Sequence, residues 1–325
     1  MKILGEFFLK RVGNYNVITI KNAIKNTFGN TLKKRCNNNV ITSIALRINI
    51  VITMLFFSGS IWAKTVQQDM IFLDVFSPVA QGTFVYGKTQ VGTQVFYQDM
   101  PITLTSDGDF VLALPKDAPK EMELVAIKDN QKISKTYNVI SRKWKEEVVN
   151  GLPPKKVSPS EDDLKRITQE NQLLRRGREN THHLSFPTCF TRPVDKKARI
   201  SSEFGSSRIL NGVKTAGHSG TDYALSSGSE IYAPADGVVK ITHPDMFYSG
   251  KTILIDHGYG VFSSYSHLSD ILVQQGDNVK QGDLIGKVGT TGRSTGPHLH
   301  LTLTWFGVRV DPEYILKTYA CEGQK

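Results

Sequence analysis

The chain has 325 residues, enough for about two domains of roughly 150 residues each, so a sizeable core can be buried. Its composition, with 39% hydrophobic and 22% charged residues, excludes a disordered, collagenous or multi-span membrane chain. The net charge of +10 is concentrated in residues 1–63, which hold nine Lys or Arg and one Glu, whereas residues 64–325 hold 31 basic and 29 acidic residues. A basic surface for nucleic acid would lie on the folded part of a chain, so no nucleic-acid partner is expected.

Residues 1–63 are typical of a basic leader that ends in a signal peptide or a membrane anchor. An apolar stretch at 48–57 is followed by small residues, the order found in signal peptides. This stretch is too short to cross a bilayer, which favours cleavage after Ala63 or after Ser60. If residues 41–62 are taken as one segment, an uncleaved anchor is the alternative. We therefore expect an exported, periplasmic protein that contacts the inner membrane only if the leader is uncleaved.

The cysteines suggest one disulfide. Export places a protein in an oxidising compartment, where cysteines tend to pair. Cys36 would leave with a cleaved leader, and Cys189 and Cys321 then remain near the two ends of the last domain. A disulfide between them is expected, with two buried free thiols as the alternative.

Residues 64–150 are predicted to form a β-rich accessory domain that resembles a small β-sandwich. Apolar and polar residues alternate there in short runs separated by turn residues. The predicted strands lie at residues 83–86, 94–97, 110–114 and 123–127. We find no catalytic constellation in this sequence, so a binding or spacer role is expected.

Residues 151–185 are predicted to be a Pro-rich linker followed by a charged helix. Two successive prolines cannot continue a helix or a central strand. Ser158 is the predicted N-cap, with Pro159 at the first helical position and Glu161 three residues after the cap. Acids at the start and arginines at the end complement the helix dipole, and the arginines are expected on a solvated face. The predicted apolar face consists of Leu164, Ile167 and Leu174.

Residues 186–325 contain the residues that carry chemistry. His218 and Asp222 are four residues apart, with small residues between them that allow close backbone approach. His298 and His300 are two apart at the start of a predicted strand, and this period places both rings on one face. Two neutral imidazoles and one carboxylate around an open fourth position are the usual ligands of catalytic zinc. The spacing alone leaves open which histidine completes the set.

Six short motifs follow one another in residues 199–313. They are Gly-His-Ser-Gly-Thr-Asp at 217–222, Ala-Pro-Ala-Asp-Gly-Val-Val at 233–239, Ile-Asp-His-Gly-Tyr-Gly at 255–260, Tyr-Ser-His-Leu at 265–268, Val-Lys-Gln-Gly-Asp at 279–283 and Gly-Arg-Ser-Thr-Gly-Pro-His-Leu-His at 292–300. In this order they resemble the LytM or lysostaphin-type family of zinc peptidoglycan endopeptidases. The whole arrangement, a β-rich exported domain, a linker and this last domain, resembles that of the periplasmic members in Gram-negative bacteria. The resemblance implies a mainly β protein whose residues 186–325 form an antiparallel β-sheet peptidase domain.

The resemblance also implies the site residues. One Zn²⁺ per chain would be held by His218, Asp222 and His300, and His267 and His298 would be two unligated catalytic histidines. Zinc would bring the pKa of a bound water toward about 7 and polarise the scissile carbonyl. The free histidines would orient or deprotonate that water and would stabilise the oxyanion or protonate the leaving amine. His257 is expected to be structural.

The implied activity is hydrolysis of peptide cross-links in peptidoglycan, which is the expected partner. A periplasmic setting implies a D-alanyl to diaminopimelate cross-link as the target. The sequence has no His-Glu-x-x-His helix, which excludes the thermolysin type of site. The alternative is a latent or non-catalytic regulator of other cell-wall hydrolases, a role that some family members have after losing zinc ligands. All five expected residues are present in this chain.

Overall fold

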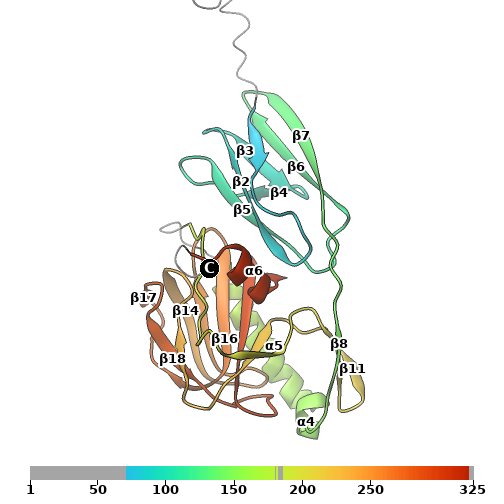
Figure 1. Ribbon diagram of the computed structural model, residues 1–325, viewed down its shortest axis with the longest axis vertical. Helices are drawn as coiled ribbons and strands as arrows, with labels where there is room; N and C mark the ends of the chain where they lie inside the picture. The colour runs from blue at the N-terminus through green and yellow to red at the C-terminus, as the bar shows by residue number, and fades with distance from the viewer. Residues whose placement is uncertain (1–70, 180, 182–185, 322–325) are drawn as a thin grey trace, which may run out of the picture. The chain divides into compact units, whose positions relative to one another are not determined.

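A computed structural model describes residues 71–179, 181 and 186–321 (Figure 1). The predicted leader, residues 1–63, lies outside these residues. The described residues belong to one compact unit. They are mainly β, as predicted, with a short helical segment in the middle of the chain. None of the helices in this part of the chain has the length and apolarity needed to cross a membrane.

The predicted small β-sandwich is present as two antiparallel sheets with the strand orders β1-β2-β5 and β4-β3-β6-β7. Their bounds are β1 Leu73–Val75, β2 Thr83–Thr89, β3 Gln94–Tyr97, β4 Met100–Ile102, β5 Asp109–Leu114, β6 Glu121–Lys128 and β7 Gln131–Asn138. Phe84 and Phe110 from the first sheet and Leu124 from the second are fully buried in one core. All four strands predicted from alternation are therefore confirmed.

The sheets are followed by β8 Glu146–Val149, α4 Pro154–Val157 and α5 Glu161–Gly177. The charged helix is confirmed, but the predicted N-cap is wrong, because Ser160 caps α5. The Ser160 hydroxyl accepts a hydrogen bond from the Asp163 backbone N–H, and the Asp163 carboxylate accepts one from the Ser160 N–H. Ser158 instead ends α4, since its N–H donates to the carbonyl of Pro154.

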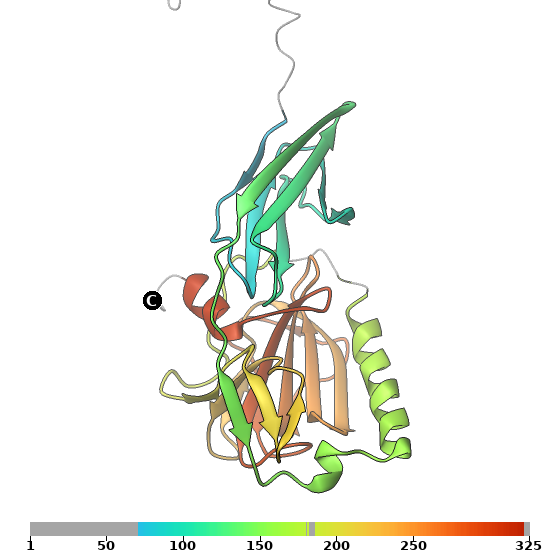
Figure 2. The same cartoon turned by 90° about the vertical axis from the view of Figure 1, so that its right-hand side faces the viewer.

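The second half of α5 packs alongside the large sheet described next (Figure 2). Leu174 contacts a small cluster that includes the buried Ile241 and Leu254. Gly177 allows this contact to be close, because an added Cβ would lie 2.6 Å from Cδ1 of Ile241 and the side chain of Ile241 would have to shift. Leu164 is 50% exposed, so the apolar face of α5 is narrower than predicted.

The last domain is built on a ten-stranded sheet with the main order β17-β14-β15-β16-β19-β12-β9, to which β13, β18 and β20 are joined. Every pairing in it is antiparallel, as predicted. Its strands are β9 Arg199–Ser202, β12 Thr221–Ala224, β13 Glu230–Tyr232, β14 Gly237–Met246, β15 Gly250–Asp256, β16 Val261–Ile271, β17 Asn278–Val279, β18 Leu284–Val288, β19 His298–Trp305 and β20 Val308–Val310. Helix α6, Pro312–Thr318, follows β20.

A separate three-stranded sheet joins the linker to this domain. Strands β10 Ser207–Leu210 and β11 Val213–Thr215 form a hairpin, and β8 pairs with β10 in parallel. The pairing places Glu147 opposite Arg208. Residues at the end of the predicted accessory domain therefore contribute the strand β8, which pairs with β10 of the last domain. The alternation of apolar and polar residues within either domain does not indicate this pairing.

Cys189 and Cys321 form a disulfide that joins residues 132 positions apart. The backbone on either side is paired as well, since Phe190 forms a parallel bridge with Ala320. The disulfide therefore ties the beginning of the last domain to its end.

Replacing both cysteines by serine is expected to lower the free energy of unfolding by roughly 2–5 kcal/mol, because the denatured chain regains the freedom of a long loop. Denaturant unfolding of the variant and of the wild type, with and without reductant, measures the effect. Reduced wild type should match the variant. Equal midpoints for oxidised wild type and variant would show that the disulfide contributes no stability.

Candidate metal centre and active-site cleft

Strand pairing brings two of the predicted ligands together. Asp222 on β12 lies directly opposite His300 on β19 in the antiparallel register. His218 lies on the turn before β12, which comes close to β19 because Gly220 has no side chain. A Cβ at Gly220 would lie 2.1 Å from the carbonyl oxygen of Leu301. The small residues between His218 and Asp222 therefore allow the close approach expected from the sequence.

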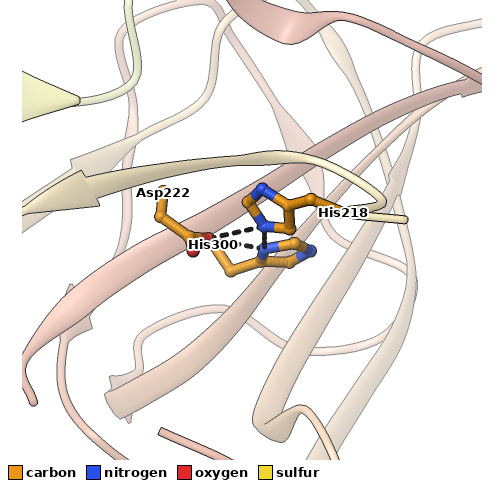
Figure 3. Close-up of side chains that lie close together, drawn as sticks. All are labelled: His218, Asp222 and His300. Atoms are coloured by element: carbon orange, nitrogen blue, oxygen red, sulfur yellow. Dashed lines mark hydrogen bonds and ion pairs between the residues drawn. The ribbon is translucent and has the colours of Figure 1, made fainter. Parts of the chain in front are cut away.

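The donor atoms of His218, Asp222 and His300 point toward one another (Figure 3). Nε2 of His218 lies 3.0 Å from Oδ1 of Asp222 and 3.0 Å from Nδ1 of His300, and the third side of the triangle is 2.7 Å. A tetrahedral site with bonds of about 2.0–2.1 Å to nitrogen and oxygen has edges of about 3.3 Å. If the three donor atoms moved apart by a few tenths of an ångström, their triangle would match one face of a zinc tetrahedron.

The other nitrogen of each imidazole is held by the protein. Nδ1 of His218 lies 2.9 Å from the carbonyl oxygen of Glu203, so it carries the proton and donates it there. Nε2 of His300 lies 3.1 Å from the Thr302 hydroxyl and 3.2 Å from the Ser219 hydroxyl. These contacts leave the lone pairs of His218 Nε2 and His300 Nδ1 directed at the centre of the triangle, as metal ligands require.

The second oxygen of Asp222 is held by Arg208. Nη2 of Arg208 lies 2.9 Å from Oδ2 of Asp222, and Nε of Arg208 lies 3.7 Å from Glu147. Burial disfavours the charged form of Asp222, but its close contacts with the imidazoles of His218 and His300 hold its pKa well below the usual range. Asp222 is therefore ionised and oriented, with Oδ1 left for the site.

Glu147 extends this network to the linker strand. Its carboxylate accepts hydrogen bonds from the hydroxyls of Ser202 and Ser206. The Ser202 hydroxyl also lies 2.9 Å from Nδ1 of His218. Glu147 on β8 thus contacts Arg208 directly and is connected to the predicted ligand His218 through Ser202.

His267 and His298 lie beside the triad. Their ring centroids are 4.6 Å apart, and Nε2 of His298 lies 3.8 Å from Oδ1 of Asp222. Nδ1 of His267 donates to the carbonyl of Thr291 at 2.7 Å, and Nδ1 of His298 donates to that of Gly296 at 2.8 Å. In the neutral form of each ring, Nε2 is therefore the nitrogen without a proton, and it can accept one.

His267 is held in an unusual backbone conformation, with φ of 66°. This left-handed region is unfavourable for residues other than glycine, and such strain is found at functional sites. Burial, followed by the nearby imidazoles, lowers the pKa of His267 to about 3, and burial lowers that of His300 to about 4. Both imidazoles are thus neutral at pH 7, as a proton acceptor and a metal ligand must be.

All five predicted site residues line or border one cavity of about 1080 Å³. Side chains from α5, β8 and the loop before β19 line it as well. Arg178 at the end of α5 is half-buried in this lining, so the prediction that the helix arginines lie on a solvated face is wrong for Arg178.

Sequence reasoning missed Arg208 and Glu147, which lie outside every motif and meet through the pairing of β8 with β10. No local pattern could have identified them. His257 is fully buried, with Nδ1 2.8 Å from the Asp236 carbonyl and Nε2 2.7 Å from the Ser263 hydroxyl. These contacts fit the structural role expected for His257.

Comparisons with known proteins support the resemblance. The chain is 42% identical over 151 residues to the peptidoglycan DD-endopeptidase ShyA of Vibrio cholerae, covering 42% of this chain and 34% of the relative. It is 44% identical over 116 residues to the DD-carboxypeptidase/endopeptidase Mpg of Neisseria meningitidis, covering 35% of this chain and 26% of the relative. The match thus spans about a quarter to a third of the length of these curated relatives.

A crystal structure of a peptidase M23 from Pseudomonas aeruginosa matches 75% of this chain and 97% of its own, with 28% identity and a TM-score of 0.58. The last domain alone makes up less than 75% of this chain, so the structural likeness extends beyond the last domain. Residues 216–312, which include the triad and both further histidines, match the description Peptidase family M23. This segment therefore matches this family of peptidases, and the predicted resemblance to LytM or lysostaphin-type peptidases is confirmed.

Proposed function

We propose that the protein is a zinc-dependent endopeptidase that hydrolyses peptide cross-links of peptidoglycan. The observation that carries the proposal is the triangle of donor atoms from His218, Asp222 and His300, with sides of 2.7–3.0 Å. Two nitrogens and one oxygen are the ligand set of catalytic zinc sites that keep a position open for water. The two held nitrogens and the pairing of Asp222 with Arg208 give the set its orientation.

Zinc held by these residues would supply a Lewis acid and a water that is acidic enough to act as a nucleophile near pH 7. His267 and His298 would move the protons. A neutral Nε2 on each ring can accept a proton from the attacking water, and the resulting imidazolium can donate it to the amine that leaves when the C–N bond breaks. Sequence and geometry support both histidines for this work.

Peptidoglycan is proposed as the substrate because relatives of the matched segment are named for it. ShyA is a peptidoglycan DD-endopeptidase, and Mpg is a DD-carboxypeptidase/endopeptidase. We propose a D-alanyl to diaminopimelate cross-link as the target bond. The disulfide between Cys189 and Cys321 supports the further proposal that the protein is exported to the periplasm, since disulfides persist in oxidising compartments.

Digestion of isolated Gram-negative sacculi tests the proposal. Purified protein is loaded with zinc and incubated with sacculi, and the released muropeptides are identified by mass spectrometry. Cross-linked dimers should disappear while matching monomers appear, and the masses of the products identify the bond. Bound zinc without any cleavage would instead favour a latent enzyme that needs activation, and a protein that binds no zinc would favour a regulatory role.

Arg208 is expected to support metal binding without touching the metal. Replacing it by methionine keeps the aliphatic volume but removes the charge that holds Oδ2 of Asp222. We expect the affinity for Zn²⁺ to fall by about 10–100-fold, as for other residues that orient ligands. Competition with a chromophoric chelator measures the affinity. Arg199→Met on the neighbouring strand β9 is the matched control, because its side chain is exposed, and it should bind as wild type.

A further inference from the structure

The cavity at the triad is rich in arginine. Among the residues that line it, the basic ones are Arg175, Arg178, Arg208, Arg293 and Arg309, and the acidic ones are Glu147, Glu179 and Asp222. Arg208 is paired with both Glu147 and Asp222. Within residues 71–179, 181 and 186–321, the other four arginines make no ion pair. The cleft therefore has an excess of positive charge even before a metal is bound.

Arg293 is one of these unpaired arginines, and both its backbone and its side chain are held by Tyr248. It lies five residues before His298, in the loop that joins β18 to β19. Its backbone N–H donates to the carbonyl of Tyr248 at 2.8 Å, and its guanidinium stacks on the Tyr248 ring, 4.2 Å from the centroid. Gly292 before it has φ of 74°, and a Cβ there would lie 2.5 Å from Tyr248 and Gly250 backbone atoms. The loop is thus packed tightly, and the guanidinium is presented from a fixed position.

The environment of Arg293 favours a bound anion. The side chain is half-buried, and in the described part of the chain its guanidinium donates no hydrogen bond to a protein acceptor. Burial, with a smaller contribution from the nearby charge of Arg208, lowers the pKa of Arg293 from its usual value. A partly buried cation without an acidic partner is unfavourable in the free protein. A carboxylate brought in by a ligand would relieve this, and the planar guanidinium suits a carboxylate.

We propose that Arg293 binds a free carboxylate of the substrate and so makes the cleft selective for acidic peptides. This inference rests on the proposed function and adds a substrate class to it. In a D-alanyl to diaminopimelate cross-link, the carbon that bears the scissile nitrogen also bears a free carboxylate. An arginine in the lining of the same cavity as His298 and His300 is suited to hold that group while the adjacent amide is hydrolysed. A glycine cross-bridge offers no such carboxylate.

The test compares two soluble cross-linked peptides that differ only in this group, a carboxylate in one and a carboxamide in the other. Wild type is expected to cleave the carboxylate peptide with a kcat/KM about 10–100-fold higher, the range of one charge-assisted hydrogen bond. Arg293→Gln should lose this preference by losing activity on the carboxylate peptide alone. Arg176→Gln is the matched control, because Arg176 is an exposed arginine of α5 outside the cavity lining, and it should retain the preference.

Binding to the metal-free protein supplies a second readout. Titration calorimetry with the diaminopimelate product peptide and its carboxamide should show a preference for the carboxylate in wild type and none in Arg293→Gln. If neither peptide is cleaved but this preference is found, the proposed activity fails and the inference stands. Equal treatment of the two peptides by wild type overturns it. So does an Arg293→Gln variant that loses the same factor on both peptides, because Arg293 would then act on the reaction in another way.

Discussion

The His300→Ala variant is expected to lose high-affinity zinc binding and to hydrolyse cross-linked peptides on the order of 10³-fold more slowly or worse. His300 supplies one of three donor atoms, and its Nδ1 lies 2.7 Å from Asp222 and 3.0 Å from His218. Removing it leaves two ligands, too few for a catalytic zinc site. The several kcal/mol of transition-state stabilisation that a metal contributes would be lost with it, at about 1.4 kcal/mol per factor of ten.

Zinc content by atomic emission and release of muropeptides from sacculi measure the two effects. His243→Ala is a matched control, because His243 lies on β14 of the same sheet and is absent from the cavity lining. It should bind one zinc and cleave as wild type. A His300→Ala variant that is folded, binds zinc with unchanged affinity and retains full activity would show that His300 is not a ligand.

The parts of the site that could be predicted from the sequence depend on local geometry. A period of two along a strand places His298 and His300 on one face wherever that strand lies, and β19 is indeed a strand from His298 to Trp305. The four-residue spacing of His218 and Asp222 is local as well, because the short turn between them is enough to bring the two side chains together. The accessory strands were predictable for the same reason, because alternation is a property of each strand alone.

The parts that could not be predicted depend on long-range pairing. Glu147 meets Arg208 only because β8 pairs in parallel with β10, about sixty residues later in the chain, and neither strand carries a motif. Arg293 lies within the motif at residues 292–300, but its stacking on Tyr248 requires the loop between β18 and β19 to fold against β14 and β15. The misplaced helix cap has another cause. Ser158 and Ser160 are each followed three residues later by an acid, and only the preceding helix α4 decides between them.

The second large effect is expected at the two histidines beside the triad. His267→Ala and His298→Ala should each lower kcat by about 10²–10⁴-fold, the usual contribution of a general acid or base. Zinc content should stay at one per chain, because neither side chain belongs to the triangle of donor atoms. This combination separates them from His300→Ala, which is expected to lose the metal as well. A variant that keeps its zinc and its full rate would remove that histidine from the mechanism.

The double variant His267→Ala/His298→Ala tests whether the two rings act on one proton path. Their centroids are 4.6 Å apart, and each has its Nδ1 proton bound to a backbone carbonyl, which leaves the same kind of free Nε2 on both. If one ring needs the other to hold the attacking water, removing both should cost little more than removing the worse single one, as in other catalytic groups that act as a unit. If the product of the two single losses is observed instead, the rings serve separate steps, one at the water and one at the leaving amine. Single-turnover rates measured on one soluble cross-linked peptide decide between these outcomes.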